Sequence, residues 1–185
     1  MEAELLRTVV AALESAGIPH MVTGSIASAI HGQPRATRDI DFVIDPNDQA
    51  VEILVTSFPT DRFYVGDAHS AVAQRDMFNI IDVTTGWKAD LIIRKDRAFS
   101  REEFARRQPA IIAGTQTYVS TPEDAILSKL EWHTISESDT QRRDVIEMII
   151  ANIDSLDHDY LNHWASELGL AELLSEVWNE ANAER

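Results

Sequence analysis

The stretch over residues 22–45 narrows the possible folds of this chain more than any other part of it. An apolar run ends in Gly24 and Ser25, an Ala- and Ile-rich segment and a Gly-Gln-Pro turn follow, and the sequence Asp39-Ile-Asp41-Phe-Val-Ile comes next. This order predicts a strand, a short helix, a turn and a second strand. Because side chains alternate between the faces of a strand, Asp39 and Asp41 point to one side and the apolar residues to the other. Two carboxylates on one face indicate a site for a divalent metal ion.

Gly-Ser followed, after a spacer of about a dozen residues, by Asp-x-Asp on a strand resembles the signature of the nucleotidyltransferase superfamily, which has the polymerase-beta-like fold. Within it, Arg35-Ala-Thr-Arg-Asp39-Ile-Asp41 is similar to the minimal and abortive-infection-type enzymes, which include the toxins of type IV toxin–antitoxin pairs. The resemblance covers roughly residues 20–150. It implies transfer of a nucleoside monophosphate from a Mg²⁺-bound triphosphate such as ATP to an acceptor hydroxyl.

The resemblance also implies a fold of the α+β class. We expect a mixed β-sheet flanked by helices, followed by a C-terminal helical bundle. The expected division is a nucleotidyltransferase domain over residues 1–119 and a helical region over residues 120–185 packed on it.

The chemistry of phosphoryl transfer explains why such a site needs these residue types. Two cations about 3.5–4 Å apart stabilise both the attacking and the leaving oxygen, and Mg²⁺ needs only a few carboxylates because it keeps several waters. Gly24 would let the backbone approach the triphosphate, and Ser25 would open a helix whose free N–H groups favour phosphate. The structural alternative is that Gly-Ser is a simple strand-to-helix turn and Asp39 a cap. Both motifs occurring together, in the right order, favours the metal site.

The resemblance implies a third carboxylate on a strand beside Asp-x-Asp, and Asp82 and Asp90 are the two candidates. Residues 77–83 and 88–93 predict a hairpin, and a tight turn centred on Thr85-Gly86 would pair Asp90 with Ile81 and place the two aspartates on opposite faces. Lys-Ala-Asp90-Leu-Ile resembles the third-carboxylate strand of the family. An aspartate in so apolar a strand is also costly unless paired or liganded. We therefore predict that Asp39, Asp41 and Asp90 are catalytic and hold two Mg²⁺ ions, and that Asp90 accepts the acceptor's proton.

Three further residues are candidates for binding the nucleotide. Arg35 either neutralises the carboxylates of the metal-free protein or contacts phosphate. Thr-Pro-Glu-Asp-Ala-Ile-Leu-Ser-Lys129 resembles a family segment in which a helix lysine reaches the triphosphate, and Asp144 matches a family acid downstream of that lysine. The alternative for Lys129 is a surface residue whose ammonium group extends into water. A polar linker expected over residues 133–140 is longer than in relatives and leaves the register of Asp144 open.

The composition of the chain limits the kinds of partner it can bind and the cell compartment in which we expect it. The chain has 185 residues and no cysteine, which excludes disulfides and cysteine-ligated zinc. It has no apolar run of membrane-spanning length and starts unlike a signal peptide, so we expect a cytoplasmic protein without membrane contact. Its net charge is −15. Residues 151–185 hold eight acids against Arg185, a balance of −7, which makes tRNA the least suitable acceptor.

The acceptor and the partners stay open between alternatives. A protein side chain, as in toxin–antitoxin pairs, is the first candidate, and a cationic small molecule such as an aminoglycoside suits the acidic composition. The last two predicted helices, over residues 155–168 and 170–183, carry two tryptophans and are interpreted as packing, or as a docking surface for a protein partner or a second copy. The competing class is a catalytically silent binding protein of the same fold, antitoxin-like or regulatory. Retention of all three carboxylates argues against it, because such a cluster repels itself without metal.

The remaining elements follow from periodicity and capping signals. Helices are predicted over residues 2–16, after Asp45-Pro46 with Ile53 buried, and over residues 100–110 with Ser100 as the N-cap. A single strand is predicted over residues 111–119.

Overall fold

The structure is a computed structural model of the chain, and it describes residues 2–185. These residues form two compact units. The first runs up to Ser25 and resumes over Ala36–Ser120, and the second combines Ile26–Arg35 with Thr121–Arg185. Among the described residues, no helix is both long and apolar enough to cross a membrane. The sequence-based division into domains at residues 119 and 120 stays a prediction.

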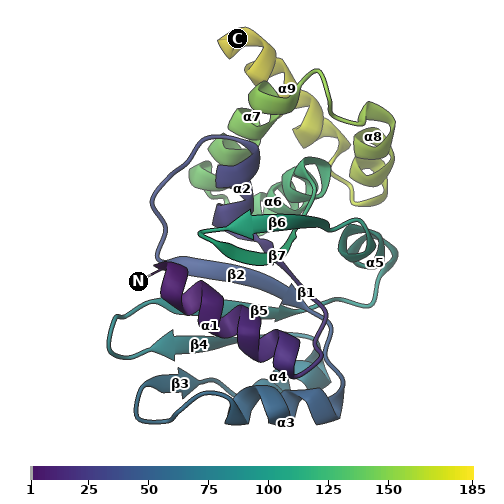
Figure 1. The fold of residues 1–185 in the computed structure, drawn as a ribbon. Coiled ribbons are helices and arrows are strands. Elements are labelled where there is room, and N and C mark those ends of the chain that lie inside the picture. Colours follow the sequence, from purple (N-terminus) through teal and green to yellow (C-terminus); the bar gives the residue numbers. More distant parts are fainter. Residues whose placement is uncertain (1) are drawn as a thin grey trace. The chain divides into compact units, whose positions relative to one another are not determined.

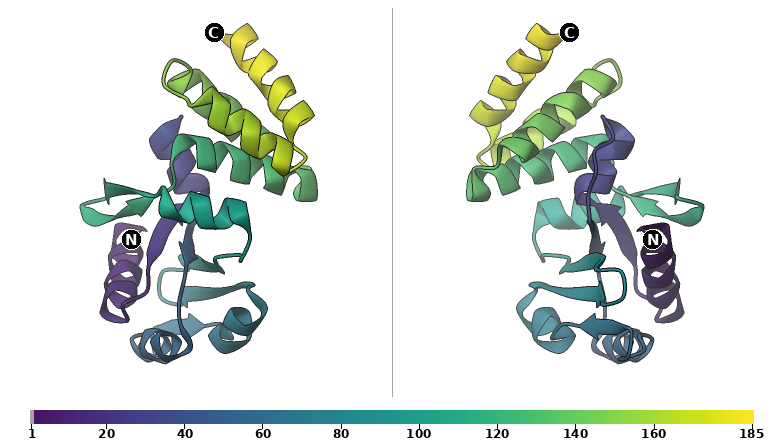
Figure 2. Two further views of the ribbon diagram at one scale, coloured as in Figure 1. Left: turned by 90° about the vertical axis from the view of Figure 1, so that its right-hand side faces the viewer. Right: turned by 90° about the vertical axis from the view of Figure 1, so that its left-hand side faces the viewer.

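The first unit is built on one mixed sheet with the strand order β3-β4-β5-β2-β1-β7-β6 (Figure 1). The β2–β5 and β1–β7 pairs are parallel and the others antiparallel. In Figure 2 the sheet is seen near its edge, with α1 on one side of the strands and α5 on the other. The elements of this unit are α1 (Glu2–Ser15), β1 (His20–Thr23), β2 (Asp39–Ile44), α3 (Asp48–Thr56), β3 (Phe63–Val65), α4 (Ala68–Gln74), β4 (Met77–Asp82), β5 (Lys88–Ile93), α5 (Ala98–Ala105), β6 (Gln108–Ile112) and β7 (Thr115–Val119).

The second unit is helical. Its elements are α6 (Pro122–Ser136), α7 (Asp139–Asn152), α8 (His158–Glu167), α9 (Ala171–Glu184) and most of α2 (Gly24–His31), whose first two residues belong to the first unit. Thr121 caps α6 through its hydroxyl, which accepts the N–H of Asp124, and Pro122 occupies the first turn, as the sequence predicts. The end of α2 is fixed to α7, because the Asn152 amide donates to the carbonyl of His31. The α+β class with a mixed sheet and a helical C-terminal part is thus confirmed.

The region after β5 differs from the sequence-based prediction. α5 begins at Ala98, so Ser100 lies inside the helix, where its hydroxyl accepts from Arg97, and is not the N-cap. The helix predicted to run to residue 110 ends at Ala105, because residues 108–112 form β6. The single strand predicted over residues 111–119 is wrong: these residues are the end of β6, a turn and β7, which pair as an antiparallel hairpin. Their two-residue turn is Ala113-Gly114, with φ of 47° and 79°. Alanine rarely adopts the left-handed conformation, so the turn gave no sequence signal.

Two further predictions are wrong. The polar linker expected over residues 133–140 is reduced to two residues, because α6 runs on to Ser136 and α7 begins at Asp139. Glu137 makes this tight connection possible by adopting a left-handed conformation with φ of 48°. Ile53 is not buried either: its side chain lies on the outer face of α3 and is 49% exposed.

Candidate active site

The Asp-x-Asp strand has the two-faced character that its sequence predicts. Along β2, Ile40, Phe42 and Ile44 are completely buried. Asp41 is half-buried and Asp39 is exposed on the opposite face. The apolar face anchors the strand in the centre of the sheet, and the carboxylates are left on a face that solvent can reach.

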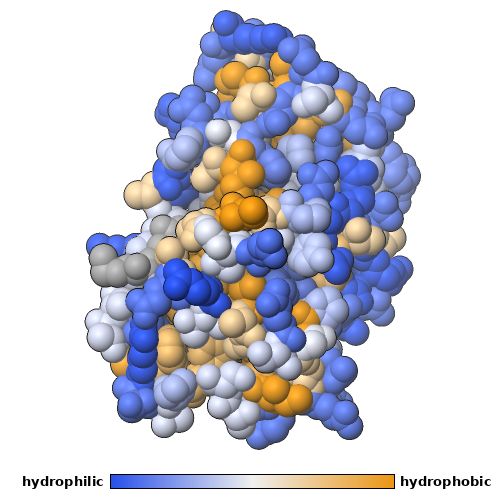
Figure 3. All heavy atoms as spheres, in the orientation of Figure 1, coloured by the Kyte–Doolittle hydropathy of each residue, from blue (hydrophilic) through white to orange (hydrophobic). Residues whose placement is uncertain are grey.

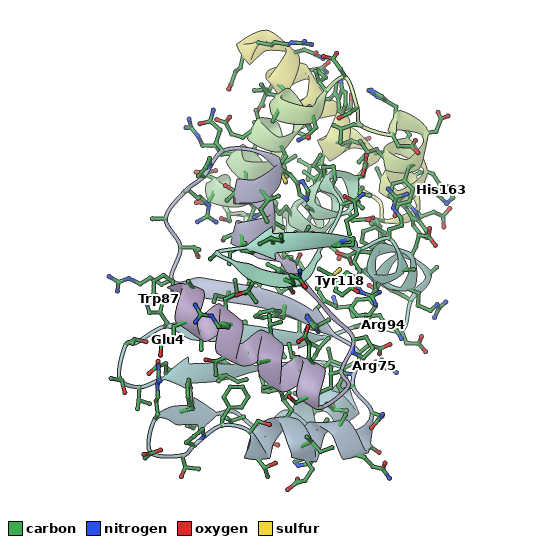
Figure 4. The ribbon with its side chains drawn as sticks, viewed as in Figure 1. Glu4, Arg75, Trp87, Arg94, Tyr118 and His163 are labelled. Atoms are coloured by element: carbon green, nitrogen blue, oxygen red, sulfur yellow. The ribbon has the colours of Figure 1, made fainter. Side chains whose placement is uncertain are left out.

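The neighbouring strand β5 brings Asp90 beside Asp41. β2 and β5 run parallel in a register that pairs Asp41 with Asp90 and Asp39 with Lys88. Since paired residues on adjacent strands point to the same side, the four side chains form a compact group on one face of the sheet. In Figure 4 the labelled Trp87 and Arg94 mark the two ends of β5, the strand that carries Lys88 and Asp90.

The β4–β5 hairpin differs from the predicted register by two residues. Asp90 pairs with Asn79 and not with Ile81. The turn is longer than expected, because the Asp82 carboxylate accepts the backbone N–H groups of Thr84 and Thr85. An even shift leaves every side chain on its predicted face, so Asp82 still points away from the face of Asp90.

Asp82 has a structural role on the other face of the sheet. It is 2% exposed, and its Oδ2 lies 2.8 Å from Nη2 of Arg62. The Arg62 guanidinium, by hydrogen bonding to this carboxylate, lowers the pKa of Asp82, with the Thr84 N–H acting in the same direction. Asp82 is therefore a charged anchor of the turn, and Asp90 is the aspartate that shares a face with Asp41.

Lys88 is the residue of this group that sequence reasoning missed. Its Nζ lies 2.8 Å from Oδ2 of Asp90 and 3.7 Å from Oδ1 of Asp39. The hydrogen bond that Lys88 donates to Asp90 raises the pKa of Lys88. The negative charges of Asp90, Asp39 and Asp41 act in the same direction, and burial opposes them. The signal was present in the sequence, because Lys88 and Asp90 are two residues apart on a strand and must share a face.

Asp90 has one carboxylate oxygen without a partner. Its side chain is 9% exposed, Oδ2 is paired with Lys88, and Oδ1 is buried with no hydrogen bond from any described residue. A buried, unsatisfied carboxylate oxygen is costly and indicates a ligand that the oxygen is meant to bind. Hard oxygen donors of this kind suit Mg²⁺. Within residues 2–185, however, no three acidic or histidine side chains already converge around a common metal position.

Gly24 closes the site from the side of β1. It follows Thr23, which pairs with Asp41, and it has a left-handed conformation with φ of 60°. A Cβ atom at this position would lie 2.0 Å from Oδ2 of Asp41. The position therefore requires glycine for two reasons, backbone conformation and close approach to the carboxylate. Ser25 comes next, in the first turn of α2.

The other candidates lie in the second unit and contact one another. Nε of Arg35 donates to both carboxylate oxygens of Asp144 at 3.1 and 3.2 Å. Nζ of Lys129 lies 2.8 Å from Oδ2 of Asp144 and 2.7 Å from Oε1 of Gln141. Lys129 is 4% exposed, so the alternative of a surface lysine is wrong. The Asp144 carboxylate thus binds the positively charged side chains of both Arg35 and Lys129. Contact of Arg35 or Lys129 with a triphosphate stays a prediction.

Comparisons with solved structures identify the fold. The antigenic nucleotidyltransferase-like protein from Paracoccidioides brasiliensis is 19% identical, with a TM-score of 0.56 over 96% of this chain and 92% of that one. The antibiotic-resistance factor ANT(2'')-Ia, in complex with adenylyl-2''-tobramycin, is 14% identical, with a TM-score of 0.61 over 90% of this chain and 96% of that one. The lincosamide antibiotic adenylyltransferase LnuA, bound to lincomycin, is 12% identical, with a TM-score of 0.54 over 80% and 96%.

These similarities establish that the chain has the nucleotidyltransferase fold. At the level of sequence, it matches no protein-family model and no curated protein. The fold predicted from Gly-Ser and Asp-x-Asp is confirmed, whereas the abortive-infection-type subfamily stays a prediction. The activity has to be argued from the site.

Proposed function

We propose that this protein is a Mg²⁺-dependent nucleotidyltransferase that moves a nucleoside monophosphate from a nucleoside triphosphate to an acceptor hydroxyl. The observation that carries the proposal is the register of two parallel strands. It places Asp41 and Asp90 side by side, with Asp39 and Lys88 next to them, on the accessible face of a sheet with the nucleotidyltransferase fold. The unpartnered Oδ1 of Asp90 supports a ligand at this place.

Asp39, Asp41 and Asp90 would hold two Mg²⁺ ions, which supply charge stabilisation to the attacking and leaving oxygens. The acceptor oxygen forms a bond to the α-phosphorus, and the bond from that phosphorus to the bridging oxygen of the β-phosphate breaks. Pyrophosphate leaves with this electron pair. The hydroxyl proton passes to a carboxylate, for which we propose Asp90, since proton transfer requires a positioned base within hydrogen-bonding reach.

Gly24 and Ser25 would contact the triphosphate. The first turn of a helix has N–H groups without intrahelical partners, and these favour phosphate. Here they follow directly on a glycine that has no side chain to obstruct the approach. This arrangement supports a nucleotide bound between Gly24 and Ser25 and the carboxylates of β2 and β5, all of which belong to the first unit.

For the acceptor, we propose a cationic small molecule with a free hydroxyl. The second unit holds fifteen acids against five basic residues, a balance of −10, whereas the first unit carries −5. In Figure 3 the region of α7 and α9 shows hydrophilic side chains with hydrophobic patches among them. The negative charge attracts cations and repels nucleic acid. ANT(2'')-Ia, which has been solved with adenylyl-2''-tobramycin, shares the fold over nearly its whole length. A protein acceptor, as in toxin–antitoxin pairs, and a cytoplasmic location stay predictions.

A catalytically silent binding protein is the second candidate, and one observation favours it. Lys88 lies among the carboxylates, and a lysine that neutralises them without metal would let the fold keep them after activity is lost. The two candidates differ in whether the chain transfers a labelled nucleotide.

The test is a transfer assay with each of the four nucleoside triphosphates labelled at the α-phosphate. The acceptors are tobramycin, lincomycin and a bacterial cell extract, and pyrophosphate release is followed in parallel. We expect Mg²⁺-dependent label transfer by the wild type and none by Asp41→Asn. Asp61→Asn, which removes the same charge at an exposed position of the first unit, serves as the matched control and should retain transfer. Absence of transfer and of pyrophosphate release with all triphosphates would favour the silent protein.

A further inference from the structure

We propose that Lys88 is a built-in competitor of the metal ion, whose ammonium group holds Asp90 and Asp39 in the metal-free protein and leaves them when a divalent cation binds. This inference rests on the proposed function, because it concerns the same carboxylates. It adds a residue to the site that neither the Gly-Ser motif nor the Asp-x-Asp motif contains. Lys88 does not bind the metal ion but competes with it for the carboxylates of Asp39 and Asp90.

The position of Lys88 is set by the sheet and not by a flexible loop. Lys88 is the first residue of β5 and pairs with Asp39 across the parallel β2–β5 ladder, while Asp90 pairs with Asp41. The ammonium group therefore stands on the same face as all three carboxylates. With Nζ at 2.8 Å from Asp90 and 3.7 Å from Asp39, one lysine contacts two of the three proposed metal ligands.

This contact keeps Oδ2 of Asp90 from a metal ion, while Oδ1 is buried and has no hydrogen-bond partner among the described residues. A cation that is to bind Asp90 through Oδ2 must therefore displace or shift the ammonium group. Among the described residues, no three carboxylates are gathered around one point. A divalent ion held by Asp39 and Asp90 would supply the positive charge that Lys88 supplies in its absence.

Lys88 is suited to leave. Its side chain is 33% exposed, whereas that of Asp90 is 9% exposed. A lysine has a long stem with several rotatable bonds, and its ammonium group is strongly hydrated once it reaches water. The carboxylates cannot leave in the same way, because they are fixed on central strands of the sheet. Without Lys88 and without metal, three like charges would face one another.

The test is a titration of the nucleotide-free protein with Mg²⁺, and separately with Mn²⁺, followed by thermal unfolding. Lys88→Met should unfold at a lower temperature than the wild type in the absence of metal, because the carboxylates lose their counter-charge. It should also reach half of its metal-induced shift at a concentration about fivefold lower, which corresponds to the upper range of exposed ion pairs. Lys88→Arg keeps the charge and the donor, so it should restore the wild-type stability without metal and should not bind metal more tightly.

Lys95→Met is the matched control for charge, since Lys95 is exposed in the same unit and lies beyond the other end of β5. It should leave the metal midpoint unchanged. If Lys88 were a purely structural residue, Lys88→Met would unfold at a lower temperature, but the metal concentration at half of the thermal shift would be unchanged. If Lys88 oriented Asp90 for the metal, Lys88→Met would bind the metal more weakly than the wild type. Either result overturns the inference. Should Lys88→Met not fold, Lys88→Gln carries the same comparison.

Failure of the proposed function has a different signature. A wild type that shows no shift with either cation would refute the metal site itself, and with it the competition. A wild type that responds to metal, together with a Lys88→Met variant that responds no more readily, would refute the role of Lys88 and leave the metal site standing.

Discussion

Replacing Gly24 by alanine tests whether the junction between β1 and α2 is shaped by the Asp41 carboxylate. Two costs add at this position. Alanine at a φ of 60° costs about 1–2 kcal/mol. The new methyl group would also lie 2.0 Å from Oδ2 of Asp41, and relieving such an overlap costs about 1–3 kcal/mol. We therefore expect Gly24→Ala to lower the free energy of unfolding by about 2–5 kcal/mol.

Gly17 provides the matched control, because its φ is 66° and a Cβ atom there would meet nothing within 4 Å. Gly17→Ala should lose only the backbone cost, about 1–2 kcal/mol. Chemical denaturation of both variants measures the difference, and thermal unfolding should follow it at roughly 2–4 °C per kcal/mol for a chain of this length. If Gly24→Ala were no less stable than Gly17→Ala, the close approach of Gly24 to Asp41 would be refuted.

Three further predictions concern buried polar groups. Asp144→Ala should lower the free energy of unfolding, measured by urea denaturation, by about 3–5 kcal/mol, because the buried Lys129 loses its carboxylate partner. Lys129→Met should cost less, since Asp144 keeps the guanidinium group of Arg35. Burial lowers the pKa of His20 below its ordinary value of 6.5, so the unfolded chain takes up the proton at a higher pH than the folded protein does. The free energy of unfolding of the wild type therefore falls as the pH drops through about 6.5. His20→Phe should lose less of this free energy than the wild type between about pH 7.5 and 5.5. Tyr160→Phe should cost about 1–3 kcal/mol by calorimetry, because it removes the 2.5 Å hydrogen bond to the fully buried Asp124.

The centre of the site could be predicted from the sequence because it depends on strand periodicity. The apolar residues 40, 42 and 44 fix which face of β2 is buried, and this alone determines where Asp39 and Asp41 point. The same rule separated Asp90 from Asp82 although the predicted hairpin register was wrong by two residues. An even error in register does not change the face of a side chain.

Other features depended on contacts that no local pattern encodes. The β6–β7 turn places an alanine in a left-handed conformation, which the paired strands impose and the sequence does not announce. The burial of Lys129 arises from Asp144 and Gln141 on the next helix, so periodicity along α6 could only assign it to a flank. Lys88 differs from these cases, because its shared face with Asp90 could have been read from the sequence.

The most direct test of the central claim is the thermal stability of the protein with Mg²⁺ alone and with each of the four ribonucleoside triphosphates, for the wild type and for Asp39→Ala/Asp41→Ala. A triphosphate at a hundred times its dissociation constant should add about 2.7 kcal/mol to the free energy of unfolding of the wild type. The account predicts a Mg²⁺-dependent shift with at least one triphosphate that is lost in the double variant. Equal shifts in both proteins, or no shift with any triphosphate, would contradict a nucleotide site built on the carboxylates of β2 and β5.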